Sequence, residues 1–410
     1  MKKVVWTLLI VIGALSGDIA TAADQGFLFG TITTEWGDEY TGRIRWDKNE
    51  GFWDDILDAT KEDDDRYDPK YRPRKRISIF GIKIFTDENW DFSYNSSSQL
   101  RFGHIKSIEP RSRGRAQVRL KSGETIRFED AGTDLGSSNR GITIDDPDEG
   151  IVDLKWRDID RVEFFAEPDD YVPTDTRVGR LYGRVTTENN ETFVGFVIWD
   201  ADEIYSTDIL DGEDRDRDRE VPFDRIASIQ RRGSRGSLVT LTTGRELKLH
   251  GTNDVDDGHR GVGVNIATLG RVEINWDDFD KVEFLDIPAT AIMRYDDFDG
   301  GRRLQGTVTT DYGDTFTGDI AWDNDERFTW ECLNGDQDDV EYDIEFGQIA
   351  RIERQSRRSC TVTLKDGTKI RLSGSNDVDE DNKGIFIETV DGDLEEMDWD
   401  DFEVVVFKDM

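Results

Sequence analysis

The feature that most restricts the fold of this chain is an internal repeat. Residues 181–284 align with 304–407 at a constant offset of 123 positions without a gap, and 39 of the 104 residue pairs are identical. A looser copy runs from about residue 27 to residue 165. Self-similarity at a fixed period is typical of chains built from tandem structural units. We therefore expect three units, called unit 1, unit 2 and unit 3 below, at residues 24–167, 178–287 and 301–410.

A shorter signature occurs twice in each unit. It consists of an apolar residue, an aromatic residue two positions later, and two more apolar residues at steps of three. The six occurrences are Leu100/Phe102/Ile105/Ile108, Leu154/Trp156/Ile159/Val162, Val221/Phe223/Ile226/Ile229, Ile274/Trp276/Phe279/Val282, Ile344/Phe346/Ile349/Ile352 and Met397/Trp399/Phe402/Val405. The spacing of two fits the end of a β-strand, and the step of three fits one 3₁₀ turn. Each unit is therefore expected to consist of two related halves.

Alternation of apolar and polar residues predicts strands throughout the units. In 192–199 the apolar positions recur at every second residue and end at Trp199, so one face of that strand is expected to be buried. Turn dipeptides such as Asp366-Gly367 separate such runs. Counting them gives five short strands in each half, and no helical periodicity of useful length appears beyond the N-terminal segment. The sequence therefore predicts an all-β protein.

Five short strands with a 3₁₀ turn between the fourth and the fifth resemble the SH3-like or Sm-like small β-barrel. The resemblance is to a fold rather than to a family, and it implies three tandem repeats, each made of two five-stranded barrels. A six-bladed β-propeller with four strands per blade is the alternative, and it ranks second because of the extra strand after the 3₁₀ turn. The RNA-reading residues of Sm-type proteins have no evident match here.

The N-terminus has the layout of a secretory signal. Lys2 and Lys3 precede an apolar run at 4–15, and small residues follow at Ala20, Ala22 and Ala23. We interpret residues 1–23 as a cleaved signal peptide, with an uncleaved N-terminal anchor as the alternative, and expect export to the periplasm or the extracellular space. The apolar run is short for a membrane span, and no later stretch is apolar enough for one, so no span is expected in the mature chain.

The charge of the chain narrows the choice of partners. The formal net charge is −37, which repels nucleic acid and anionic membranes and favours cations or basic partners. There are only two cysteines, Cys332 and Cys360. Export makes a disulfide between them possible, and two separate thiols are the alternative.

Aspartate-rich loops at equivalent places in units 2 and 3 are candidates for calcium binding. Oxygen ligands at alternating positions suit a hard cation, although Asn and Asp also favour turns through local hydrogen bonds. No other cofactor is expected. The candidate ligands are Asn253, Asp254, Asp256 and Asp257 in unit 2 and Asn376, Asp377, Asp379 and Asp381 in unit 3.

The tryptophans divide into two groups. Trp46, Trp199 and Trp322 are equivalent in the repeat and occupy the apolar phase of predicted strands, so we expect them in the core. Four others lie off this pattern and are expected at surface contacts: Trp36, Trp53, Trp90 and Trp330.

An insertion at about 58–98 is the one place where unit 1 departs from the repeat. It carries a basic stretch on an otherwise acidic chain, followed by a predicted strand and an aromatic group. Long additions to small barrels often carry function, so the insertion is a candidate docking site, with an internally paired hairpin as the alternative. The candidate contact residues are Lys70, Arg72, Arg74, Lys75, Arg76 and Trp90.

No catalytic site is predicted. The sequence has no Gly-x-Ser-x-Gly elbow, no His-x-x-x-His pair and no phosphate-binding glycine loop. We therefore expect a non-catalytic exported protein that binds a protein or polysaccharide ligand. The alternatives are a structural or assembly spacer and, with less support, a polysaccharide-active enzyme.

Overall fold

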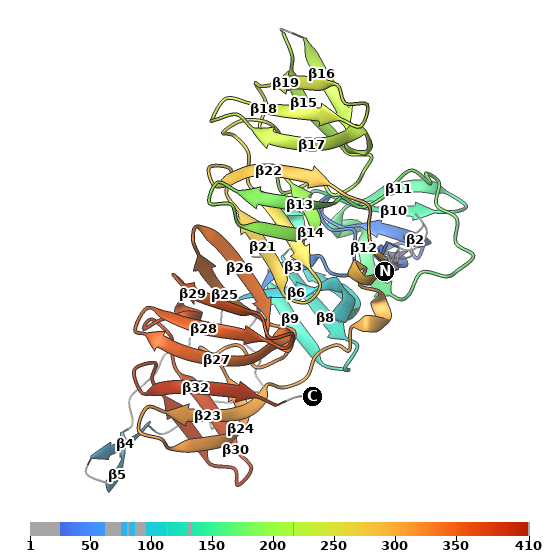
Figure 1. Cartoon of the computed structure of the whole chain (residues 1–410). Coiled ribbons are helices and arrows are strands. Elements are labelled where there is room, and N and C mark those ends of the chain that lie inside the picture. The colour runs from blue at the N-terminus through green and yellow to red at the C-terminus, as the bar shows by residue number, and fades with distance from the viewer. Residues whose placement is uncertain are drawn as a thin grey trace, which may run out of the picture.

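The computed structural model describes residues 25–61, 75–79, 82–86, 96–112, 114–129, 133–215 and 217–408, and the predicted signal peptide lies outside these ranges. Within them, all regular structure is antiparallel β-strand apart from 3₁₀ helices of three residues (Figure 1). The all-β prediction is confirmed. None of the helices in the described ranges has the length and apolar character that a membrane crossing requires.

Unit 1 forms one ten-stranded sheet. Its strands are β1 (Phe29–Thr34), β2 (Glu39–Arg45), β3 (Ile56–Lys61), β6 (Ser96–Arg101), β7 (Ile105–Ser112), β8 (Arg115–Leu120), β9 (Thr125–Glu129), β10 (Ile142–Asp146), β11 (Gly150–Leu154) and β12 (Ile159–Phe164). The strand order is β11-β10-β2-β1-β12-β7-β8-β9-β3-β6. Within the insertion, β4 (Lys75–Ile79) and β5 (Ile82–Thr86) form a separate hairpin.

Unit 2 repeats most of this order. Its strands are β13 (Tyr182–Thr187), β14 (Thr192–Trp199), β15 (Ile209–Glu213), β16 (Asp218–Pro222), β17 (Ile226–Arg231), β18 (Ser237–Leu241), β19 (Glu246–Leu249), β20 (Val262–Ile266), β21 (Gly270–Ile274) and β22 (Phe279–Phe284). They pair in the order β21-β20-β14-β13-β22-β17-β18-β19, and β15 and β16 form a two-stranded sheet of their own.

Unit 3 has the same order as unit 1. Its strands are β23 (Gln305–Thr310), β24 (Thr315–Ala321), β25 (Cys332–Gln337), β26 (Val340–Glu345), β27 (Ile349–Ser356), β28 (Ser359–Leu364), β29 (Lys369–Ser373), β30 (Ile385–Thr389), β31 (Leu394–Met397) and β32 (Phe402–Phe407). They pair as β31-β30-β24-β23-β32-β27-β28-β29-β25-β26.

None of the sheets closes into a barrel, so the expectation of small closed barrels is not confirmed. The first strand of each unit pairs with the last one, as in β1 with β12, β13 with β22 and β23 with β32. The last strand then pairs with the strand that follows the first 3₁₀ turn of the unit. In units 1 and 3 the strands of the two predicted halves therefore lie in one sheet, and in unit 2 all strands except β15 and β16 do.

Units 2 and 3 are joined into a single 18-stranded sheet. The joint is the antiparallel pair of β21 and β26, in which Gly270 lies opposite Ile344 and Ile274 lies opposite Val340 (Figure 1). A Cβ atom on Gly270 would lie 1.9 Å from the backbone oxygen of Asp343, and the φ of Gly270 is +152°. Only glycine permits this close approach of the two chains.

Unit 1 contacts the other two units through buried ion pairs. Arg180 of unit 2 reaches Asp54 of unit 1, with 2.6 Å between Nη1 and Oδ1. Oε2 of Glu345 in unit 3 forms an ion pair with Nη1 of Arg101 in unit 1, and Oε1 of Glu345 is hydrogen-bonded to Nε2 of His104, each at 3.1 Å. The arginine and carboxylate side chains of these ion pairs are almost fully buried, so each depends on its partner for stabilisation.

The tryptophans occupy the cores and the joints. Trp46, Trp199 and Trp322 have no exposed surface, as predicted. Trp53 and Trp330 are also buried, so their expected surface position was wrong. Trp330 belongs to unit 3 but packs into the hydrophobic core of unit 1, which explains why it lies outside the repeated pattern. Trp36 is exposed, whereas Trp90 lies outside the described residues.

Both cysteines are buried free thiols. Cys332 lies on β25 and Cys360 on β28, and no disulfide joins them. Of the two alternatives left by the sequence, the structure has the unbridged one.

Candidate functional sites

The same short turn follows the second strand of each unit. The three sequences are Trp46-Asp47-Lys48-Asn49-Glu50, Trp199-Asp200-Ala201-Asp202-Glu203 and Trp322-Asp323-Asn324-Asp325-Glu326. In each turn the Trp and the Glu form an isolated β-bridge. The two residues after the Trp have positive φ values, between 42° and 75°. Asp and Asn tolerate this conformation better than most residues, and it closes the turn with the Asp side chain buried.

A second aspartate faces this turn in every unit. It is Asp134 in unit 1, Asp254 in unit 2 and Asp377 in unit 3. The indole Nε1 of the turn's Trp donates to its backbone oxygen, at 2.7 Å, 2.9 Å and 2.8 Å respectively. Its Oδ2 accepts from the backbone N–H groups of Asp58, Asp211 and Asn334, at 2.6 Å, 2.7 Å and 2.7 Å.

These contacts gather carboxylates in two compact clusters. In unit 3, carboxylate oxygens of Asp323, Glu326 and Asp377 all lie within 4.8 Å of one another. In unit 2 the same holds for Asp200, Asp202 and Glu203. We call these groups the unit 3 cluster and the unit 2 cluster.

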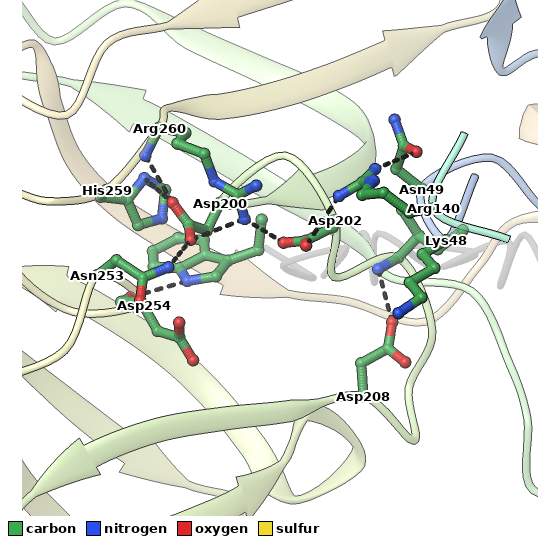
Figure 2. A network of polar contacts seen from close by, with 12 residues as sticks. Lys48, Asn49, Arg140, Asp200, Asp202, Asp208, Asn253, Asp254, His259 and Arg260 are labelled. Atoms are coloured by element: carbon green, nitrogen blue, oxygen red, sulfur yellow. Dashed lines mark hydrogen bonds and ion pairs between the residues drawn. The ribbon is translucent and has the colours of Figure 1, made fainter. Parts of the chain in front are cut away.

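Basic side chains hold the aspartates of the unit 2 cluster (Figure 2). Arg260 donates its backbone N–H to Asp200 at 2.5 Å, and its guanidinium lies 3.0 Å from the same carboxylate. Arg140 of unit 1 reaches Asp202 at 3.2 Å. In the unit 3 cluster, Lys383 occupies the place of Arg260, with its Nζ 3.6 Å from Asp323. Neither cluster has a basic side chain paired with its Glu among the described residues.

Burial and crowding raise the pKa values of these acids. Burial, and then the neighbouring carboxylates, raise the pKa of Glu203 to about 9 and that of Glu326 well above its usual range. Burial also raises the pKa of Asp377 to about 8 and that of Asp323 to about 6. Each cluster therefore collects more negative charge than its bases neutralise, and it favours a bound proton or a bound cation.

The eight predicted calcium ligands have different fates in the structure. Asp377 belongs to the unit 3 cluster, and Asp254 occupies the equivalent place in unit 2. Asn253 and Asn376 donate their amides to Asp200 and Asp323. Asp256 and Asp379 accept from backbone N–H groups two residues further on, which makes them local turn formers. Asp257 and Asp381 are exposed.

Sequence reasoning found only Asp377 of the unit 3 cluster and no member of the unit 2 cluster. The missed members lie about 50 residues before the Asp-rich loops: Asp200, Asp202, Glu203, Asp323 and Glu326. The signal that identifies them is the motif Trp-Asp-x-(Asn/Asp)-Glu, which recurs in all three units.

The predicted docking residues of the insertion lie largely outside the described residues. This applies to Lys70, Arg72, Arg74 and Trp90, whereas Lys75 and Arg76 begin β4. The ends of the predicted insertion belong to the sheet of unit 1, because β3 pairs with β6 over Ile56–Lys61 and Ser96–Arg101. The added segment is therefore shorter than predicted, at 62–95.

Two sheet edges resemble the two strands that join units 2 and 3. β11 of unit 1 is equivalent to β21, and β16 of unit 2 is equivalent to β26. Within the described ranges β11 pairs only with β10, and β16 pairs only with β15. Ile151 on β11 is 61% exposed, which is unusual for an isoleucine on a strand.

Comparison of the chain with models of known protein families, with curated proteins and with solved structures finds no match.

Proposed function

We propose that this chain is an exported, non-catalytic interaction protein that associates with copies of itself through the edges of its sheets. We also infer that it consists of three tandem units, each made of two related halves. The repeated strand order and the repeated Trp-Asp turn support this organisation. An interaction protein with this organisation would present the unpaired edges of its sheets to partners in the periplasm or the extracellular space.

The observation that carries the proposal is the joint between β21 and β26. It is an edge-to-edge strand pair between units 2 and 3, and exposed edges of this type are templates for strand addition. The pair tolerates Glu273 opposite Glu341, so a like-charge pair within the strands does not prevent it.

β11 has the features that make this joint possible. It begins with Gly150, which is equivalent to Gly270, and a Cβ atom added at Gly150 would meet no other atom within 4 Å. In unit 3 the equivalent position is Asp393, which precedes the acidic strand β31. A side chain at that position blocks the close approach seen at Gly270. We therefore assign β11, and not β31, as the docking edge.

The occupant we propose for β11 is β16 of a second copy. Transfer of the β21–β26 register to the equivalent positions places Ile151 opposite Glu220 and Gly150 opposite Val221. In the same register Arg219 lies opposite Val152, and Asp153 lies opposite Asp218, where the β21–β26 joint has the like-charge pair of Glu273 and Glu341. Because the two strands differ, this contact is head-to-tail and produces chains of copies rather than closed dimers.

We expect Ile151→Glu to weaken self-association at least tenfold. The change removes an apolar contact and puts a like charge opposite Glu220, and cross-strand pairs of like charge are destabilising. Light scattering after size exclusion, over a range of protein concentrations, measures the effect. Val390→Glu is the matched control, because Val390 is 89% exposed and lies outside every strand.

A charge-swap variant identifies the occupant. Glu220→Lys added to Ile151→Glu should restore association, because the two positions then carry opposite charges. A wild-type protein that stays monomeric at all concentrations would contradict the proposal, and so would a double variant that is no better than the single one.

Deletion of 62–95 is expected to leave folding and self-association unchanged. The deletion spares β3 and β6, which complete the sheet of unit 1. A short Gly-Ser connection between Lys61 and Ser96 serves as the linker. If this variant folds with an unchanged unfolding midpoint but no longer associates, the insertion is the docking site and β11 is not.

A further inference from the structure

We propose that Asp323, Glu326 and Asp377 bind one divalent cation of the calcium type, and that Asp200, Asp202 and Glu203 form a second site of the same kind. Oxygen ligands lie 2.3–2.6 Å from calcium, so two ligands of one ion lie within about 5 Å of each other. The carboxylate oxygens in each cluster already lie within 4.8 Å of one another. One ion between them therefore reaches all three groups without a change of fold.

Unpartnered oxygens point to a missing ligand in these clusters. Glu326 is only 9% exposed, and its Oε2 is buried with no hydrogen-bond partner among the described residues. Oδ1 of Asp325, in the same turn, is also buried with no hydrogen-bond partner among the described residues. In unit 2 the equivalent Oε2 of Glu203 also has no described partner. Buried polar atoms nearly always have a partner, and one left without costs about 1–3 kcal/mol.

The charges around Glu326 show what kind of ligand is missing. Asp323, Asp325 and Asp377 face it with further negative charge. Three bases of the described residues lie near the turn. Lys383 contacts Asp323, Lys61 is held by Glu331 and by the backbone oxygen of Asp325, and Arg327 donates to the backbone oxygen of Asn324. None of the described residues donates a hydrogen bond to Oε2 of Glu326, so that atom lacks a partner on the side of the cluster.

The donor set selects the class of cation. All three groups are carboxylates, which are hard ligands, whereas zinc sites favour nitrogen and sulfur. The unit 3 cluster is also largely closed, because Asp323 and Asp377 are nearly fully buried. Magnesium gives up its water shell reluctantly, so a buried carboxylate group suits calcium better.

Unit 1 has the same turn and a buried, unpartnered Oε2 on Glu50, but no third carboxylate of the described residues joins it within 4.8 Å. It carries Asn49 where the other turns carry Asp202 and Asp325, which removes one negative charge. Arg140 then lies 3.0 Å from Asp47, and the positive charge of Arg271 acts on both Glu50 and Asp134. We therefore restrict the proposal to the clusters of units 2 and 3.

Terbium luminescence tests the proposal with the full mature chain. Terbium is a hard, oxygen-seeking ion that substitutes for calcium, and Trp322 excites it because its indole contacts Asp377. Titration in potassium chloride with millimolar magnesium suppresses weak binding to the acidic surface. We expect two tight sites that calcium displaces.

Charge-neutral variants assign the sites. Glu326→Gln keeps the shape of the side chain and should remove one of the two tight sites, and Glu326→Gln with Glu203→Gln should remove both. Asp381→Asn is the matched control, because it removes one exposed charge from the Asp-rich loop and should keep both sites. In thermal melts with chelator, the Glu326→Gln variant should be at least as stable as the wild-type protein, because Oε2 of Glu326 has no partner when no cation is bound.

Three results would overturn the proposal. One is a wild-type protein with no tight terbium site. Another is an unchanged number of sites in the double variant. The third is loss of a site in Asp381→Asn, which would move the cation to the exposed loop.

Discussion

Replacement of Arg180 by methionine is expected to lower the free energy of unfolding by about 3–5 kcal/mol. The guanidinium of Arg180 lies 2.6 Å from Asp54 and 3.7 Å from Asp55, at the joint of units 1 and 2. It also lies over the rings of Phe196 and Phe52, at 3.5 Å and 4.2 Å from their centroids. Methionine retains the apolar stem but leaves two buried carboxylates without their counter-charge.

Chemical denaturation at neutral pH measures this effect. Arg177→Met is the matched control, because Arg177 pairs with Asp175 at an exposed site and its replacement should leave the unfolding midpoint unchanged. Asp54→Asn and Asp55→Asn, added to Arg180→Met, should recover most of the loss. An Arg180→Met protein as stable as the Arg177→Met control would show that the joint does not depend on this ion pair.

In chelator, the stability of the protein is expected to fall as pH rises from about 5 to about 8. Burial raises the pKa of Asp134 and of Asp377 to about 8, compared with about 4 in an unfolded chain. An acid whose pKa is higher in the folded state than in the unfolded state contributes fully to the free energy of unfolding at pH values below its unfolded-state pKa. This contribution is lost as the pH rises through its folded-state pKa. Each pKa unit corresponds to about 1.4 kcal/mol, so we expect a loss of several kcal/mol.

Calcium should reverse much of this loss, because an ion in the clusters stabilises the ionised carboxylates. Denaturation curves at several pH values, with chelator and with calcium, measure both effects. The Glu326→Gln/Glu203→Gln variant should show a smaller pH dependence in chelator and no gain with calcium. If the free energy of unfolding in chelator instead rises between pH 5 and 8, then Asp134 and Asp377 ionise without destabilising the fold, and the prediction is wrong.

The sequence is sufficient to predict the strands, because alternation and turn residues are local signals. The burial of Trp46, Trp199 and Trp322 followed from the same alternation. The burial of Trp53 and Trp330 did not follow, because Trp53 packs against Tyr295 of the segment between units 2 and 3, and Trp330 packs into the core of unit 1. Local patterns carry no information on those contacts.

The pairing of the strands could not be predicted from local sequence patterns either. Five strands per half suggested separate barrels, whereas β12 pairs with both β1 and β7 and merges the halves. Strand counts do not specify which half a strand joins. In the clusters, Asp377 was found from its loop, but Glu326 was not, because about 50 residues separate them and only the fold brings them together.

Hydrogen exchange at the sheet edges tests the proposed association most directly. The amides of Gly150–Leu154 and Asp218–Pro222 are compared in dilute and concentrated protein, where Pro222 has no N–H group. We predict slower exchange in both segments at high concentration, with no change in β31, and the protection should disappear in Ile151→Glu. Protection that stays constant with concentration in β11 and β16, or that rises in β31 instead, would contradict edge-to-edge assembly through β11.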